Sequence, residues 1–159
     1  MQIHEADLSA PAVQGLLRLH LDGMHDASPP ESVHALGLDH LRAPDVTVWS
    51  AWDGTTLLGI GALRVEAGSP SGEVKSMRTD PAHVGKGVGR AILRTIIESA
   101  NARGLTHLYL ETGTGEPFAA AHALYLSEDF EPCGPFGAYT DDPFSRYFVR
   151  ELAPRVLHA

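Results

Sequence analysis

Apolar positions change their spacing in the middle of the chain, and this change predicts a strand followed by a helix. Residues 73–79 alternate imperfectly between apolar and polar types and contain no helix breaker, which is typical of a strand. The apolar positions that follow recur every four residues, as on one helix face: Val88, Ile92, Ile96 and Ala100. Asp80-Pro81 ends the strand, because the residue before a proline is pushed out of the helical region, and Gly104 ends the helix.

The rest of the chain predicts further strands and helices without internal repeats. We expect strands at residues 2–6, 46–52, 57–65, 106–111, 130–136 and 145–152, and helices at residues 12–24, 32–41 and 118–127. Asp53-Gly54 marks a hairpin, whereas the helical crossover after residues 73–79 implies a parallel pair with residues 106–111. We therefore expect one α/β (α+β) domain over residues 1–159, with a mixed, largely antiparallel sheet of six to seven strands and about four helices.

Composition narrows the class of protein. The chain has 159 residues, 43% of them hydrophobic and 20% charged, which is ordinary for a globular domain with a real core. Its net charge of -8 argues against a nucleic-acid partner. The single Cys133 excludes an internal disulfide framework, and no apolar run approaches the ~18 residues that span a bilayer. The N-terminus lacks the basic and apolar regions of a signal peptide, so we expect a cytoplasmic protein without a membrane partner.

The turn before the central helix is rich in glycine and positively charged. The first N–H groups of a helix lack intrahelical acceptors, and Gly85, Gly87 and Gly89 have no Cβ atoms to keep a ligand away from them. Between positions 75 and 94 Asp80 is the only acid, while five basic residues lie there: Lys75, Arg78, Lys86, Arg90 and Arg94. This pattern predicts a site for a phosphate or diphosphate, with a tight turn and a solvated helix face as the alternative.

The glycine spacing distinguishes between known phosphate-binding segments. Arg90 stands where G-x-G-x-x-G requires its third glycine, and no Gly-Lys-Ser/Thr exists for a P-loop. Val84-Gly85-Lys86-Gly87-Val88-Gly89 instead resembles the R/Q-x-x-G-x-G/A segment of the GCN5-related N-acetyltransferase (GNAT) superfamily, with Val84 in place of Arg or Gln. The predicted element order is also that of this superfamily. The resemblance implies a sheet in which the central parallel pair splays apart.

The resemblance also implies a cosubstrate and the residues that bind it. Acetyl-CoA would lie in the opening between the two parallel strands, with the backbone of Met77, Arg78 and Thr79 against its pantetheine arm. One N–H there would stabilise the thioester oxygen, which is worth on the order of 3 kcal/mol in such sites. The diphosphate would lie against Val84, Gly85, Lys86, Gly87, Val88, Gly89 and Arg90. A plain core strand at residues 77–79 is the alternative.

Two residues match positions that carry catalytic roles in the superfamily. Tyr125 lies in a segment that resembles A-x-x-x-Y-x-x-x-G-F, with Asp129 in place of the glycine, and the matching tyrosine protonates the departing thiolate. The substitution at Asp129 suggests an altered turn after this helix. Glu73 matches a glutamate that takes a proton from the substrate ammonium. A core tyrosine and a solvated carboxylate are the alternatives, and rival bases are His25, His34 and Asp141.

The acceptor is expected to be a small primary amine. In the superfamily its pocket is walled by the first helices and the last hairpin, which supply here Met24, His25, Glu31, His34, Tyr139 and Asp141. Acidic and aromatic side chains in these parts favour a cationic amine. The phrases MHDASPPESVHAL, GEVKSMR and CGPFGAY also resemble a group of small bacterial acetyltransferases that act on small molecules.

Several alternatives stay open at this point. The same fold accommodates a non-catalytic acyl-CoA-binding regulator, and an acyltransferase that uses another acyl-CoA or a hydroxyl acceptor. No metal is expected, because no H-E-x-x-H or Cys/His zinc spacing exists. Dimers are common in the superfamily, and the sequence leaves the oligomeric state open.

Overall fold

The computed structural model describes residues 1–27 and 38–152, with side chains over residues 1–22 and 39–152. In these parts seven strands and four α-helices follow one another along the chain. The strands are β1 (Gln2–Glu5), β2 (Val46–Asp53), β3 (Thr56–Arg64), β4 (Ser71–Thr79), β5 (His107–Gly113), β6 (Glu131–Cys133) and β7 (Ser145–Glu151). The helices are α1 (Pro11–Ala27), α2 (Leu38–Leu41), α3 (Val88–Ala102) and α4 (Ala119–Ser127).

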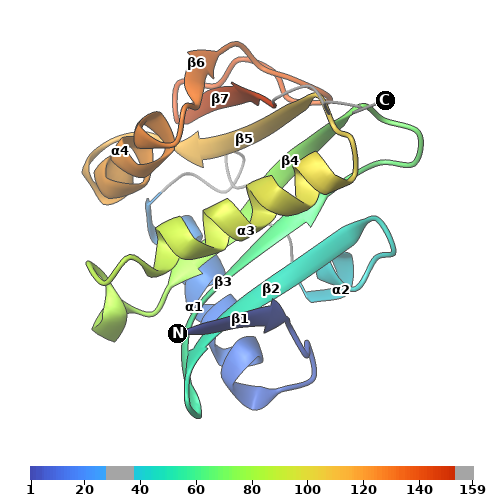
Figure 1. Cartoon of the computed structure of the whole chain (residues 1–159). Helices are drawn as coiled ribbons and strands as arrows, with labels where there is room; N and C mark the ends of the chain where they lie inside the picture. Colours follow the sequence, from blue (N-terminus) through green and yellow to red (C-terminus); the bar gives the residue numbers. More distant parts are fainter. Residues whose placement is uncertain (28–37, 153–159) are drawn as a thin grey trace.

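All seven strands form one sheet in the order β1-β2-β3-β4-β5-β7-β6 (Figure 1). Every neighbouring pair is antiparallel except β4 and β5, which pair in parallel from Ser71–His107 to Val74–Leu110. β4 continues beyond Val74 to Thr79 but pairs there only with β3. The expected mixed sheet with a splayed parallel pair is therefore confirmed.

Helix α3 packs closely on one face of this sheet because β3 carries glycine at two alternate positions. A Cβ atom at Gly61 would lie 2.6 Å from Ile92 and 2.6 Å from the sulfur of Met77, and one at Gly59 would lie 2.9 Å from Val88. Real side chains do not approach so closely, so only glycine admits the helix here. The apolar face of α3 then forms the larger core cluster with Val74 and Leu108.

Helix α1 covers the opposite face, behind the sheet in Figure 1. Its Val13, Leu16 and Leu17 pack with Ile60 and Ala62 of β3 in a second core cluster. Residues opposite one another in an antiparallel pair point to the same face. Because Glu73, Lys75 and Arg78 of β4 lie opposite Arg64, Ala62 and Ile60, they all point to the α1 face. One face of β4 is thus apolar and the other is a row of charged side chains.

The predicted elements exist in the described residues, and their bounds differ most at two strands. The strand expected at residues 130–136 covers only β6, and the strand expected at residues 106–111 continues to Gly113 as β5. Residues 32–37 of the expected second helix lie outside the described residues, and its end is α2.

The expectation of an altered turn at Asp129 is wrong. Asp129 adopts the left-handed conformation itself, with φ of 67°. The N–H of Phe130 donates to the carbonyl of Tyr125 at 3.0 Å, and the N–H of Asp129 donates to that of Leu126 at 3.3 Å. This is the hydrogen-bond pattern of a Schellman motif, so the backbone keeps the glycine-type turn although the side chain is not glycine.

Candidate active site

The glycine turn links the end of β4 to the start of α3. Asp80 begins it, since its carboxylate accepts the N–H of Ala82 at 2.9 Å and caps the 3₁₀ turn at Pro81–His83. Gly85 and Gly87 then both adopt φ of 79°, a left-handed conformation that strains any other residue. The first intrahelical bond runs from the N–H of Ala91 to the carbonyl of Gly87. The N–H groups before Ala91 in α3 therefore lack intrahelical acceptors and carry the positive end of the helix dipole.

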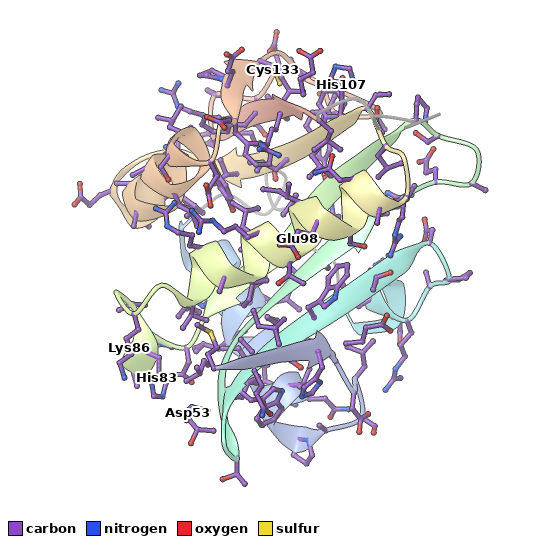
Figure 2. The ribbon with its side chains drawn as sticks, viewed as in Figure 1. Asp53, His83, Lys86, Glu98, His107 and Cys133 are labelled. Atoms are coloured by element: carbon purple, nitrogen blue, oxygen red, sulfur yellow. The ribbon has the colours of Figure 1, made fainter. Side chains whose placement is uncertain are left out.

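Side-chain charge around this turn is partly neutralised. Lys86 lies beside His83 at its tip, with 3.1 Å between the ammonium and Nδ1 (Figure 2). Glu128, which follows α4, lies 2.6 Å from Nε of Arg94 and 3.5 Å from Nη1 of Arg90. The sequence places Glu128 more than 30 positions from these arginines, so Asp80 looked like the only acid near the basic segment.

The end of β4 meets the start of α3 and the face of α4. A Cβ atom at Gly89 would lie 3.3 Å from Leu124 of α4 and 3.7 Å from the hydroxyl of Thr79. Residues 77–79, the glycine turn and the helix that carries Tyr125 therefore converge where β4 has left β5.

A bulge distorts β4 just before this point. Ala62 pairs with Lys75 and Ile60 with Arg78, so Ser76 and Met77 together face one residue of β3. Ser76 adopts φ of 55°, which costs a non-glycine residue about 1–3 kcal/mol.

On the α1 face, burial together with the positive charge of Arg78 lowers the pKa of His20 to about 4. His20 is therefore a buried neutral imidazole beside a guanidinium.

Tyr125 lies in the core between α4 and the sheet. Its ring contacts Phe130 edge-on and Phe148 at a tilt, with centroids 5.8 and 6.1 Å away. Its side chain is 6% exposed, and this burial raises the pKa of Tyr125 to about 12. The phenol therefore keeps its proton at neutral pH.

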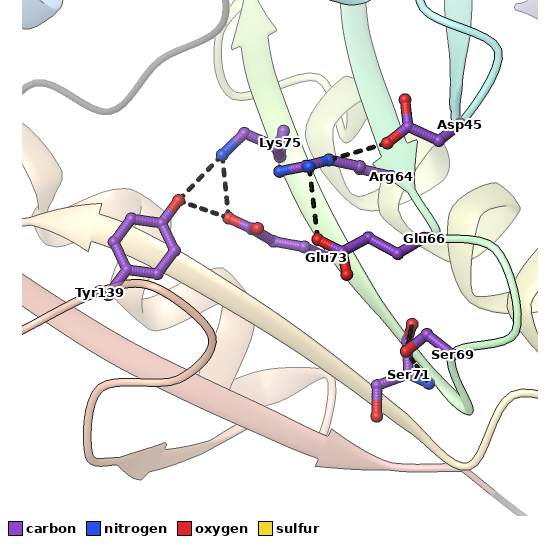
Figure 3. A network of polar contacts seen from close by, with 8 residues as sticks. All are labelled: Asp45, Arg64, Glu66, Ser69, Ser71, Glu73, Lys75 and Tyr139. Atoms are coloured by element: carbon purple, nitrogen blue, oxygen red, sulfur yellow. Dashed lines mark hydrogen bonds and ion pairs between the residues drawn. The ribbon is translucent and has the colours of Figure 1, made fainter.

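Glu73 belongs to a three-membered polar cluster on the α1 face (Figure 3). The Lys75 ammonium donates to Oε2 of Glu73 at 2.9 Å and to the Tyr139 hydroxyl at 2.9 Å. The Tyr139 hydroxyl in turn donates to the same Oε2 at 2.7 Å. Burial and the nearby charge of Glu73 raise the pKa of Tyr139 well above its ordinary value. We refer to Glu73, Lys75 and Tyr139 as the β4 cluster.

Comparison with known proteins decides the family. Residues 13–130 match the family model described as "Acetyltransferase (GNAT) family". The chain belongs to the GNAT acetyltransferase family. It is 47% identical to the uncharacterized N-acetyltransferase YsnE of Bacillus subtilis, over 96% of this chain and 100% of that protein. It is 50% identical to the uncharacterized N-acetyltransferase YedL of Escherichia coli, over 92% and 91% of the two chains. This GNAT protein is accordingly an N-acetyltransferase.

Solved structures agree with this GNAT fold. An acyl-CoA N-acyltransferase structure from Klebsiella pneumoniae superposes with a TM-score of 0.76 at 24% identity, over 96% of this chain and 97% of that one. An acetyltransferase from Bacillus subtilis, solved in complex with CoA, superposes with a TM-score of 0.70 at 17% identity, over 96% and 99%. At these identities the likeness concerns the fold alone.

The structure brings the predicted site residues of this GNAT protein into two groups. The predicted cosubstrate residues gather around the start of α3, while Glu73 and Tyr139 meet in the β4 cluster. Asp141 lies exposed on the loop between β6 and β7. Four of the predicted acceptor residues lie outside the described side chains: Met24, His25, Glu31 and His34.

Sequence reasoning placed Lys75 only among the basic residues before α3, and it missed Glu128 and His20. The pairing of Lys75 with Glu73 could have been predicted, because the two lie two positions apart on a strand and so share a face. Glu128 and His20 gave no local signal, since their partners lie on other elements. In the described part of the chain no group of three potential metal ligands exists, and no helix combines the length and apolar character of a membrane span.

Proposed function

We propose that this N-acetyltransferase transfers the acetyl group of acetyl-CoA to the primary amine of a small molecule by direct attack. The observation that carries the proposal is the separation of β4 from β5 after Val74 and Leu110, with the glycine turn directly beyond the free end of β4. An opening bounded by unpaired strand backbone and a helix N-terminus offers hydrogen bonds to an extended arm that ends in a diphosphate.

The residues at this opening fit CoA. Gly85 and Gly87 have no atom within 4 Å of the position that a Cβ would take, so the N–H groups beside them are sterically accessible. The N–H groups from Gly85 to Arg90 would hold the diphosphate, with Lys86 and Arg90 adding charge. The backbone of Met77, Arg78 and Thr79 would hold the pantetheine arm.

Two side chains are proposed to move protons. An amine attacks only when neutral, so Glu73 takes the ammonium proton, directly or through a water molecule. When bound, acetyl-CoA supplies an activated thioester, whose C–S bond breaks as the C–N bond forms. Tyr125 gives its phenol proton to the sulfur that leaves, and the second proton that the nitrogen loses on becoming an amide passes through water to restore the phenol. Its pKa of about 12 keeps that proton in place until negative charge develops on the sulfur.

The relatives support transfer to nitrogen. YsnE and YedL are both named N-acetyltransferases, and a relative from Azospirillum brasilense with 39% identity, over 80% and 82% of the two chains, is named IAA acetyltransferase. These names favour an enzyme over a non-catalytic acyl-CoA-binding regulator.

The proposal is tested by CoA binding and by release of free thiol. We expect calorimetry to detect heat with CoA, and thiol release from acetyl-CoA to depend on an added small amine. Gly87→Val should abolish both, whereas Gly104→Val should retain both. Gly104 is the matched control because it has φ of 75°, is equally open, and lies at the other end of α3. No CoA heat with the unaltered protein, or equal activity of the two variants, would refute the proposal.

A further inference from the structure

A cavity of about 280 Å³ lies on the α1 face beside the β4 cluster. It is bounded by the start of β4, the middle of β5, the end of β3 and the loop between β6 and β7. The residues that matter for its chemistry are Glu73, Tyr109, Phe136, Arg64, Glu66 and Ser71. Its volume is just below the 300–1,000 Å³ usual for drug-sized ligands, so a group of one or two rings fits it.

One wall of the cavity is aromatic. The rings of Tyr109 and Phe136 lie with centroids 4.9 Å apart and planes 32° apart. Tyr109 is opposite Glu73 in the parallel register, so both point to the same face. Phe136 is fixed from behind by Tyr139 and Tyr147, with centroids at 5.0 and 5.8 Å. Rings held in this way offer a preformed surface to a flat apolar ligand.

The cavity also contains a negatively charged hydrogen-bond acceptor, which is one carboxylate oxygen of Glu73. Both hydrogen bonds that Glu73 accepts within the β4 cluster go to Oε2. Among the described residues none donates to the other oxygen, Oε1, and Glu73 lines the cavity. A carboxylate has about four acceptor sites, so Oε1 is available to a cationic donor from a ligand.

The arginine in the cavity wall does not cancel this charge. Nε of Arg64 lies 3.1 Å from Asp45, and its Nη2 lies 3.4 Å from Glu66 (Figure 3). Its positive charge is thus shared between two other acids. Lys75 pairs with Glu73, so three acids (Asp45, Glu66 and Glu73) stand against two bases, and one surplus negative charge remains to favour an ammonium over a carboxylate.

We infer that this cavity holds the body of the acceptor, and that the acceptor is a primary amine carried on a planar aromatic group of one or two rings. The inference rests on the proposed function and specifies its substrate class. Glu73 immediately precedes Val74, where β4 and β5 separate, so an ammonium on Oε1 lies at the mouth of the opening. The ring then extends along Tyr109 and Phe136 toward Ser71.

The test compares acceptors that differ only in aromaticity. We expect kcat/KM for 2-phenylethylamine to exceed that for 2-cyclohexylethylamine by about two- to tenfold, because ring–ring contacts are favourable beyond area burial. Phe136→Leu should remove most of this preference by raising KM for the aromatic amine alone. KM for acetyl-CoA and the heat of CoA binding should not change, which also shows that the variant is folded.

Phe144→Leu is the matched control, because Phe144 is exposed on the same loop and outside the cavity wall. Equal kcat/KM for the two amines, a preference for an amino sugar such as glucosamine, or equal effects of the two Leu variants would overturn the inference and leave the proposed function intact. Absence of thiol release with every amine would overturn both.

Discussion

The hydroxyl of Tyr139 donates a 2.7 Å hydrogen bond to Oε2 of Glu73, although the two residues are 66 positions apart. This bond joins the loop between β6 and β7 to the charged face of β4. Lys75 completes the cluster; its side chain is 7% exposed and that of Glu73 is 16% exposed, so the loop covers most of the ion pair and leaves Glu73 partly accessible. A buried pair of this kind is stabilising only while its remaining hydrogen bonds are satisfied. The loop is thereby coupled to the proposed proton acceptor.

Tyr139→Phe tests this coupling. The variant keeps the ring contacts with Phe136 but loses the hydroxyl that both Glu73 and Lys75 contact. We expect the free energy of unfolding to fall by about 1–2 kcal/mol, and KM for the acceptor to rise about fivefold without change in KM for acetyl-CoA. Urea unfolding and steady-state kinetics measure both.

Tyr147→Phe serves as the control for Tyr139→Phe. Its hydroxyl donates to the carbonyl of Thr140 and so anchors the same loop without touching Glu73. If both variants raise the acceptor KM equally, loop anchoring alone accounts for the effect, and the coupling to Glu73 is refuted.

Tyr125→Phe tests the proposed acid. The substitution removes only the phenolic hydroxyl. The ring still packs against Phe130 and Phe148, so the fold should tolerate the change. We expect kcat to fall by about 100-fold, since general acids contribute about 10²–10⁴. The CoA affinity measured by calorimetry should be unchanged. Undiminished turnover would remove Tyr125 from the mechanism.

Glu128→Gln tests the electrostatics of the glycine turn. Glu128 pairs with Arg90 and Arg94, and its removal frees both cations for a diphosphate at the start of α3. We expect CoA to bind about two- to fivefold more tightly at low ionic strength, with the gain shrinking as salt screens the charges. Titrations at two salt concentrations measure this.

Glu98→Gln is the matched control for Glu128→Gln. It makes the same change in net charge on the exposed side of α3, about 15 Å along the helix from Val88 (Figure 2). If it tightens CoA binding as much, the effect is one of overall charge and Glu128 has no specific role.

Local periodicity was enough to predict the elements that position the site. The four-residue spacing of Val88, Ile92 and Ile96 predicted α3, and the hairpin signal at Asp53-Gly54 predicted the pairing of β2 with β3. The imperfect alternation of residues 73–79 is the trace of the bulge at Ser76, which shifts the register by one residue. That irregularity alone did not reveal its position, because a bulge depends on the partner strand.

Contacts between distant elements could not be predicted in this way. The bond between Tyr139 and Glu73 depends on how the β6–β7 loop folds back over the sheet, and the pairing of Glu128 with Arg94 depends on how α4 docks beside α3. Neither distance follows from a periodic pattern. The sequence therefore predicted the segments that form the candidate site, and the structure shows which charged side chains lie beside them.

Asp129→Gly should stabilise the protein. Asp129 adopts φ of 67° at the end of α4, a conformation that costs a residue with a Cβ about 1–2 kcal/mol relative to glycine. Its pairing with Arg150 at 3.8 Å is weak, because the Asp129 side chain is 85% exposed. We expect the free energy of unfolding to rise by about 1 kcal/mol in urea unfolding.

Asp129→Asn separates the effect of the backbone conformation from that of the charge, since it removes the charge but keeps a Cβ. Equal stability of the Gly and Asn variants would contradict the backbone explanation.

His20 predicts a loss of stability in mild acid. Its pKa is about 4 in the folded protein, because burial and the charge of Arg78 disfavour the imidazolium, against 6.5 for a free histidine. Between these values the unfolded chain binds a proton that the folded protein does not. The free energy of unfolding therefore falls as pH drops from 6.5 toward 4, by about 3 kcal/mol in all.

His20→Phe should flatten this slope, while His4→Phe, at an exposed position, should leave it unchanged. Urea unfolding at a series of pH values measures the slopes, and equal slopes for the unaltered protein and His20→Phe would show that other groups set the acid sensitivity.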